Sequence, residues 1–111
     1  MKADRVYLLH VRDAIRRIAE YTAQGRDAFF ASPIIQDAVV RNLEVIGEAV
    51  KNLSEVTKAS RSEVAWKQIA GMRDKLIHEY FGVNLHLVWE VVERDLPQLR
   101  LAVESLVAEK D

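Results

Sequence analysis

The sequence predicts an all-α protein: a single compact domain of four to five helices over residues 1–111. Three observations support this prediction. Apolar residues recur at spacings of three and four along almost the whole chain, and only four glycines and two prolines interrupt them. With 111 residues, 50% of them hydrophobic, and a formal net charge of -1, the chain has the composition of one globular domain. No internal repeat, low-complexity tract or second domain is visible.

The first helix is expected to begin near Asp4 as its N-cap and to end around Gly25. Its buried face is expected to consist of Leu8, Val11, Ile15 and Ile18, which follow one another at helical spacing. The next stretch, residues 27–31, contains paired phenylalanines and predicts a short turn or helical corner that closes the bundle.

The second helix is expected to open with Ser32 as N-cap and Pro33 at the first helical position, and to run to Ser54. Its apolar residues lie in near-heptad spacing and predict either core or a dimer interface: Val39, Leu43, Ile46, Val50 and Leu53. Residues 55–61 are polar and without an apolar period, which predicts a loop or a fraying helix end.

The third helix is expected from Trp66 to about Tyr80, ending before Gly82. A fourth begins near Asn84 as N-cap, and the segment Asp95-Leu96-Pro97 is expected to interrupt it because proline does not fit a helix interior. A last helix follows. The apolar faces of these two helices are Leu85, Val88, Trp89 and Val92, then Leu99, Val103, Leu106 and Val107.

The composition excludes several classes of protein. The absence of cysteine excludes a disulfide framework and thiolate metal sites, and no apolar run approaches the roughly 20 residues of a membrane span. The first residues lack the apolar core of a signal peptide, so a cytoplasmic protein is expected. Near-neutral charge means that any nucleic-acid contact is local or is made by surfaces joined across a dimer. A helical bundle this small often gains stability by dimerising, so a dimer is expected.

The third helix carries the most informative polar residues. Arg73 interrupts its apolar face, and Tyr80 lies seven residues later on the same side of the helix. His78 lies about 140° around the helix from Arg73, a gap that the long arginine side chain or a loosened helix end can bridge. Asp74 precedes His78 by one turn and is placed to hydrogen-bond its ring. The spacing permits one shared polar site.

A purely structural role accounts for the same residues. Arg73 can pair with Glu44 or Glu48, which lie one turn apart on the second helix, and Tyr80 can be a packing aromatic. The remaining candidate site residues have weaker support. His10 and His86 lack a second metal ligand at a known spacing, Trp66 and Trp89 lie at core spacing, and Lys67 and Lys75 are expected to be surface lysines.

The segment from Arg73 to Tyr80, RDKLIHEY, resembles the R-x4-H-x-Y signature of HepT-like toxins in the HEPN superfamily. Three further segments look like that subfamily: residues 46–49 (IGEA), residues 66–73 (WKQIAGMR), and the later Trp89 with Asp95-Leu96-Pro97. R-x4-H alone is a weak pattern. Together, the motif and the three further segments extend over nearly the whole chain and are a fairly specific pattern.

The resemblance implies a HEPN-type bundle that dimerises, so that two motif copies face each other and form an RNA-cleaving site without metal or cofactor. It implies Arg73 and His78 as catalytic residues, and we expect Asp74 and Glu48 to support them. It also implies a type VII-like toxin whose partner is an MNT-type nucleotidyltransferase antitoxin, which attaches AMP to the motif tyrosine, here Tyr80. Assembly beyond a dimer is left open.

The residue chemistry is compatible with RNA cleavage. Attack by the 2′-hydroxyl on the adjacent phosphorus needs a proton-transfer group, which His78 supplies near neutral pH, and a fixed positive charge, which Arg73 supplies. Products with a 2′,3′-cyclic phosphate and a 5′-hydroxyl are expected. Two alternatives stay open: a non-catalytic helical partner that binds a nucleotide or a nucleotidyltransferase, and a purely structural dimer module.

Overall fold

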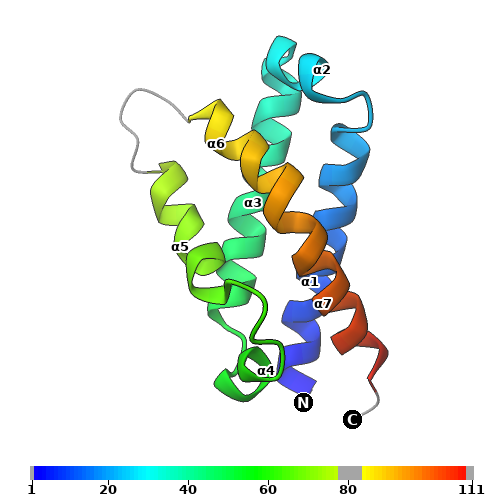
Figure 1. Cartoon of the computed structure of the whole chain (residues 1–111), viewed down its shortest axis with the longest axis vertical. Helices are drawn as coiled ribbons and strands as arrows, with labels where there is room; N and C mark the ends of the chain where they lie inside the picture. The colour runs from blue at the N-terminus through cyan, green and yellow to red at the C-terminus, as the bar shows by residue number, and fades with distance from the viewer. Residues whose placement is uncertain (1, 78–83, 110–111) are drawn as a thin grey trace.

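The computed structural model describes residues 2–77 and 84–109, apart from the side chains of Lys2, Arg73, Leu76 and Ile77. Within these ranges every regular element is a helix, as predicted (Figure 1). The elements are α1 (Lys2–Tyr21), α2 (Arg26–Ala31), α3 (Pro33–Lys51), α4 (Glu55–Ala59), α5 (Trp66–Ile77), α6 (Leu85–Glu90), the π-helix η1 (Val91–Asp95) and α7 (Leu96–Ala108).

The long helices α1 and α3 form an antiparallel pair at the centre of the bundle. α5 packs against α3, and α7 packs against α1 (Figure 1). The short α2 closes one end of the bundle, and α4 lies at the other end beside the start of α1 (Figure 1). None of the helices in the described ranges is both long enough and apolar enough to cross a bilayer.

The core contains the apolar faces that helical spacing predicts. Leu8, Val11, Ile15 and Ile18 of α1 are all buried, as are Val39, Leu43, Ile46 and Val50 of α3 and Leu53 just beyond it. The heptad-like stripe of α3 is therefore core within one chain rather than a dimer interface. Phe29 of the predicted corner is fully buried, which explains why the short α2 forms there.

Two helix starts follow the predicted capping chemistry. The Ser32 hydroxyl accepts a hydrogen bond of 3.2 Å from the Ile35 amide, with Pro33 in the first helical turn. The Asn84 side chain accepts one of 3.1 Å from the Leu87 amide at the start of α6. Both local predictions are confirmed, as is the start of α5 at Trp66.

Three predicted boundaries are wrong. α1 begins at Lys2, so Asp4 lies inside the helix instead of capping it, and α1 ends at Tyr21. Gly25, with a φ of 94°, instead precedes α2, in a left-handed conformation that favours glycine. α3 ends at Lys51, and part of the expected loop is the helix α4, capped by Ser54.

The segment around Pro97 is also different from the prediction. No break separates α6 from α7, because the backbone continues as η1, in which the Leu96 amide donates to the Val91 carbonyl five residues earlier. Proline lacks an amide hydrogen and its ring crowds the preceding turn. The wider π-turn accommodates the missing hydrogen bond and the proline ring without ending the helix. The predicted end of α5 near Tyr80 lies outside the described residues.

Candidate functional site

The helix α5 carries the first half of the predicted site. Trp66, Ile69 and Met72 bury its inner face, and the Trp66 indole N–H donates to the Arg61 carbonyl at 3.0 Å, which fixes the start of the helix. Arg73 lies within this helix, and Asp74 is exposed on it.

The rest of the predicted site is not placed. His78, Tyr80 and the side chain of Arg73 lie outside the described residues. The joint site of Arg73, His78 and Tyr80, with Asp74 as the histidine's partner, therefore stays a prediction. What is established is the helix that presents Arg73.

Glu48, the predicted supporting residue, lies in a pocket of about 280 Å³ between α1 and α3. Glu44 lines the same pocket, and so do Tyr7 and His10 from the facing helix. The Tyr7 and His10 rings meet edge to face, with centroids 6.4 Å apart. The sequence indicated no partner for His10. Its signal is the spacing of two pairs, Tyr7 with His10 on α1 and Glu44 with Glu48 on α3, each of which lies on one face of its helix.

A second pocket, of about 290 Å³, lies between α5 and the continuous helix formed by α6 and η1. Its floor contains the buried Ile69, Met72 and Val91. Gln68, Lys75 and Asp95 supply polar groups to the same pocket and are exposed. Two of its lining residues, Met72 and Lys75, flank Arg73 along α5.

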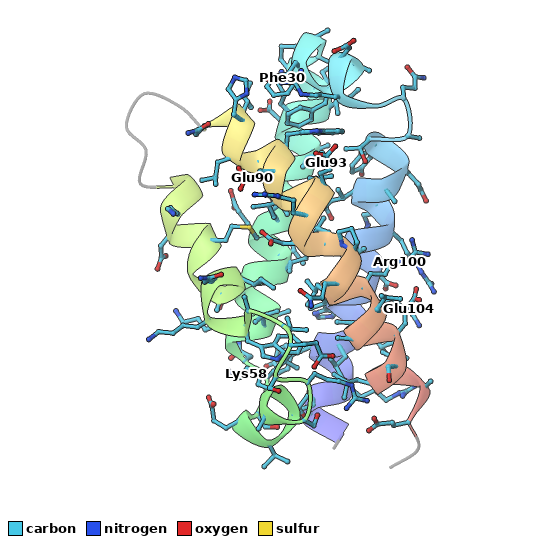
Figure 2. All side chains as sticks on the ribbon, in the orientation of Figure 1. Phe30, Lys58, Glu90, Glu93, Arg100 and Glu104 are labelled. Atoms are coloured by element: carbon cyan, nitrogen blue, oxygen red, sulfur yellow. The ribbon has the colours of Figure 1, made fainter. Side chains whose placement is uncertain are left out.

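An aromatic cluster joins α2 to α6 at one end of the bundle. Phe30 lies at this end (Figure 2), with its ring centroid 4.9 Å from that of His86, and the Arg26 guanidinium lies 4.7 Å from the same centroid. The neighbouring Phe29 ring lies against the Trp89 ring, with centroids 5.2 Å apart. Trp89 packs against the core, as its spacing predicted, whereas His86 is exposed beside Phe30.

At the other end of the bundle, Asp4 is a buried carboxylate that joins α1 to α4. It is 4% exposed and accepts hydrogen bonds from the Ser54 amide at 3.0 Å, the Ser54 hydroxyl at 2.6 Å and the Thr57 hydroxyl. Burial alone raises the pKa of Asp4. The hydrogen bonds from Ser54 and Thr57, together with the positive N-terminus, outweigh burial and hold the pKa below its ordinary value.

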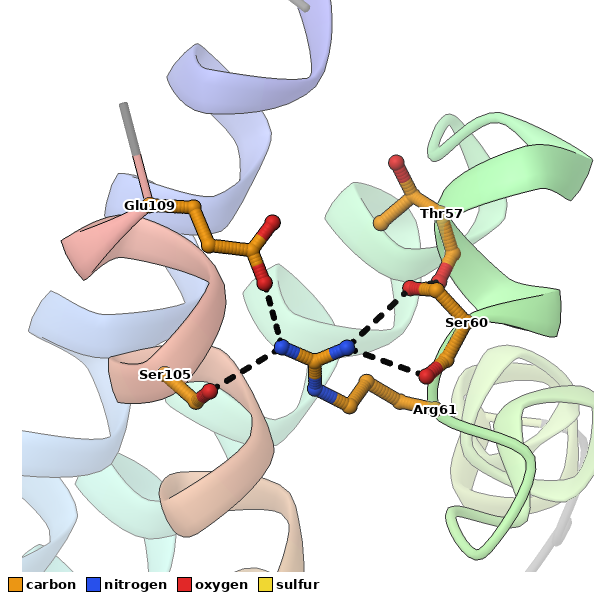
Figure 3. A network of polar contacts seen from close by, with 5 residues as sticks. All are labelled: Thr57, Ser60, Arg61, Ser105 and Glu109. Carbon is orange, nitrogen blue, oxygen red and sulfur yellow. Dashed lines mark hydrogen bonds and ion pairs between the residues drawn. The ribbon is translucent and has the colours of Figure 1, made fainter. Parts of the chain in front are cut away.

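Arg61 ties the segment after α4 to the end of α7 (Figure 3). Its guanidinium donates to the Ser60 carbonyl at 3.0 Å, to the Ser105 hydroxyl at 3.0 Å and to the Glu109 carboxylate. This network and the Asp4 cluster lie far along the bundle from the end that α2 closes (Figure 1). Both are structural connections between elements distant in sequence.

Within residues 2–77 and 84–109, no three histidine or carboxylate side chains gather as a group that could hold a metal ion.

The family model and the related proteins that match this chain indicate the same family. A family model described as Ribonuclease HepT-like matches residues 11–106. A Methanocaldococcus jannaschii protein, named as a gamma-glutamylcyclotransferase and provisionally as an RNase, is 44% identical over 108 residues, which are 96% of this chain but only 49% of that relative. This chain thus spans about half of that protein.

Two further relatives match over nearly their full lengths. A provisionally named RNase of Caldanaerobacter subterraneus subsp. tengcongensis is 44% identical over 108 residues, 96% of each chain. A "Probable ribonuclease HepT" of Thermococcus cleftensis is 40% identical over 106 residues, 95% of this chain and 96% of its own. No solved structure matches the chain significantly. The chain, a helical bundle with an Arg-x4-His-x-Tyr sequence on and after α5, belongs to the HepT-like ribonuclease family of the HEPN superfamily.

Proposed function

We propose that the chain is an endoribonuclease and the toxin of a type VII-like toxin-antitoxin pair. The observation that carries the proposal is the intact R-x4-H-x-Y pattern, Arg73, His78 and Tyr80, in a chain of the HepT-like ribonuclease family. The position of Arg73 on the well-packed helix α5 supports it, because a rigid helix limits where the arginine can reach.

The proposed reaction needs two groups. His78 accepts the proton of the RNA 2′-hydroxyl as its oxygen bonds to the adjacent phosphorus, and the bond from phosphorus to the 5′-oxygen breaks. The departing oxygen takes up a proton and becomes the 5′-hydroxyl, while the other fragment keeps a 2′,3′-cyclic phosphate. Arg73 stabilises the additional negative charge on the phosphoryl oxygens through its planar pair of donors. We propose that these steps require no metal ion.

Two carboxylates are proposed to support this chemistry. Asp74 precedes His78 by four residues, a separation at which a carboxylate can accept the ring N–H and fix the tautomer. Glu48 lies on α3, the helix against which α5 packs. Its pocket is also lined by His10 and Arg41.

The proposed antitoxin is an MNT-type nucleotidyltransferase that modifies Tyr80. The tyrosine oxygen bonds to the α-phosphorus of ATP, and pyrophosphate leaves. The attached phosphate then competes with RNA for Arg73, and its bulk fills the approach to His78. Co-expression of the two proteins is expected to raise the intact mass of wild type by whole AMP units and to leave Tyr80→Phe unchanged. A Tyr80→Phe variant that gains the same mass contradicts this assignment.

The active form is proposed to be a homodimer, because a site made from two facing motifs supplies two histidines and two arginines. Sedimentation equilibrium is expected to give twice the 12.7 kDa chain mass. A monomer that cleaves RNA at full rate contradicts the proposed shared site.

The role of Arg73 is tested by single-turnover cleavage of a fluorescently labelled RNA. Arg73→Lys keeps the charge but loses the paired donors, and we expect its rate to fall by about 10²-fold, as for other lost transition-state donors. Arg16→Lys, an exposed arginine on α1, is the matched control and is expected to keep the wild-type rate. Equal rates for wild type and Arg73→Lys would contradict the proposed role of the paired donors.

A further inference from the structure

The pocket between α5 and the α6–η1 helix combines an apolar lining with a few polar side chains. Its volume of about 290 Å³ is close to the lower limit of roughly 300 Å³ for small-molecule pockets, so it suits one base rather than a larger ligand. The buried side chains of Ile69, Met72 and Val91 line it, and Leu87 adds a further apolar contact. Such a lining matches the apolar faces of a flat base.

The polar groups in the pocket match the edge of a base. Gln68 and Asp95 come from opposite walls, one from α5 and the other from η1. Asp95 does not cap α7, and its carboxylate forms no hydrogen bond or ion pair with the side chains that the structure describes. The adjacent Arg94 is paired with Glu90 instead, at 2.6 Å. Asp95 is exposed on the pocket wall, where its carboxylate can face a ligand.

The π-helix η1 is an independent indication that this pocket has a function. π-turns inside α-helices occur frequently at functional sites, where they change the direction of a side chain. In this chain the π-turn ends at Asp95, the one carboxylate among the described residues that line the pocket. The wider π-turn rotates the residues of α6 and η1 relative to α7. It therefore determines on which face of the continuous helix Asp95 lies.

A carboxylate selects among the four RNA bases. It offers two acceptor oxygens side by side and no donor. Guanine presents two adjacent donors on its Watson–Crick edge, N1–H and the 2-amino group, whereas adenine, cytosine and uracil each place an acceptor next to their donor there. The Gln68 amide can donate to the guanine O6. Asp95 thus matches guanine better than it matches the other bases.

The pocket also lies beside Arg73 along the axis of α5. Met72 and Lys75 lie one residue before and two residues after Arg73, and an α-helix rises only about 1.5 Å per residue. Lys75 lines the same pocket, and its ammonium group can contact a phosphate. From these observations we infer that Gln68 and Asp95 form a guanine-reading subsite for the RNA, next to the phosphate that Arg73 holds. The inference rests on the proposed ribonuclease function.

The first test is the base preference of cleavage. A random-sequence RNA pool is cleaved by wild type, Asp95→Asn and Glu93→Gln, and the cut sites are sequenced. Wild type is expected to prefer guanine at one fixed position near the cut, and Asp95→Asn to weaken that preference by about 10- to 100-fold, the discrimination of one bidentate contact. Glu93→Gln removes the same charge from the same π-turn outside the pocket and is expected to keep the preference (Figure 2).

The second test does not depend on catalysis. In amide NMR spectra of the free protein, guanosine monophosphate is expected to shift signals of Gln68, Met72 and Leu87, and cytidine monophosphate to leave them in place. Asp95→Asn is expected to abolish the shifts. Cleavage without a guanine preference, or with one that Asp95→Asn retains, overturns the subsite and leaves the ribonuclease intact. If wild type does not cleave RNA, the proposed function fails, and the NMR titration alone decides whether the pocket binds guanine.

Discussion

The Asp4 carboxylate accepts a hydrogen bond of 2.6 Å from the Ser54 hydroxyl, fifty positions later in the chain. Ser54 is also the N-cap of α4, and its hydroxyl oxygen accepts from the Thr57 amide at 3.2 Å. One buried carboxylate therefore fixes the first turn of α1 and the start of α4 together. The end of the bundle that contains α4 therefore depends on the carboxylate of Asp4.

Replacing Asp4 with asparagine is expected to lower the free energy of unfolding by about 1–3 kcal/mol. The amide keeps the size of the side chain, but one of its two acceptors becomes a donor that faces the Ser54 and Thr57 hydroxyls. Urea unfolding followed by circular dichroism measures the change. Asp37→Asn, an exposed position on α3, is the control and is expected to match wild type. Equal midpoints for all three proteins would mean that the Asp4 cluster contributes nothing.

The stability of the protein is expected to depend on pH through Asp4. Its pKa in the folded chain lies below the ordinary value of 3.8, so the unfolded chain takes up this proton first as the pH falls. The stabilisation is complete well above pH 3.8 and is lost as the pH falls through the lower, folded pKa. Urea midpoints between neutral pH and pH 3 are expected to fall more steeply for wild type than for Asp4→Asn. Parallel curves for the two proteins contradict this.

Removing the Phe29 ring is expected to destabilise the bundle by about 3–5 kcal/mol. The ring is fully buried and contacts both Phe30 and Trp89, so Phe29→Ala leaves a cavity as well as losing apolar contact. Thermal unfolding measures the loss, and tryptophan fluorescence reports the changed surroundings of Trp89. Ile34→Ala, on a side chain that is 82% exposed, is expected to change stability by less than about 0.5 kcal/mol. Comparable losses in the two variants argue against α2 as a core element.

Loss of the Arg61 guanidinium is expected to loosen the end of α7 with little effect on global stability. The group contacts Ser105 and Glu109, but the Glu109 side chain is 57% exposed, and exposed ion pairs contribute less than about 1 kcal/mol. In Arg61→Ala, hydrogen exchange is expected to speed up in residues 105–108 and to stay unchanged in α3. Unchanged exchange at the end of α7 would show that helix packing alone holds it.

Much of the fold could be predicted because its determinants are local. Ser32 and Asn84 cap helices through amides three residues away, and the buried stripes of α1 and α3 repeat at helical spacing. The role of Asp4 could not be predicted, since its partners are fifty or more residues distant. The short helix α4 has no buried residue and so no apolar period to reveal it.

The candidate site could be predicted only in part. The sequence and its family resemblance identify Arg73, which lies on the predicted helix, and the rest of the motif falls outside the described residues. That His10 and Glu48 line one pocket could not be predicted, because it depends on how α1 and α3 are rotated against each other. Asp95 looked like part of a helix break, and only the backbone of η1 places it in a pocket beside α5.

The central claim is that this chain cleaves RNA through His78 without a metal ion. Its most direct test is cleavage in EDTA by unmodified protein of verified intact mass, comparing wild type with a folded His78→Ala variant and identifying the 3′ ends. Wild type is expected to cleave in EDTA and to leave 2′,3′-cyclic phosphates, and the variant is expected to be inactive. No cleavage by wild type across several RNAs, or equal cleavage by both proteins, contradicts it.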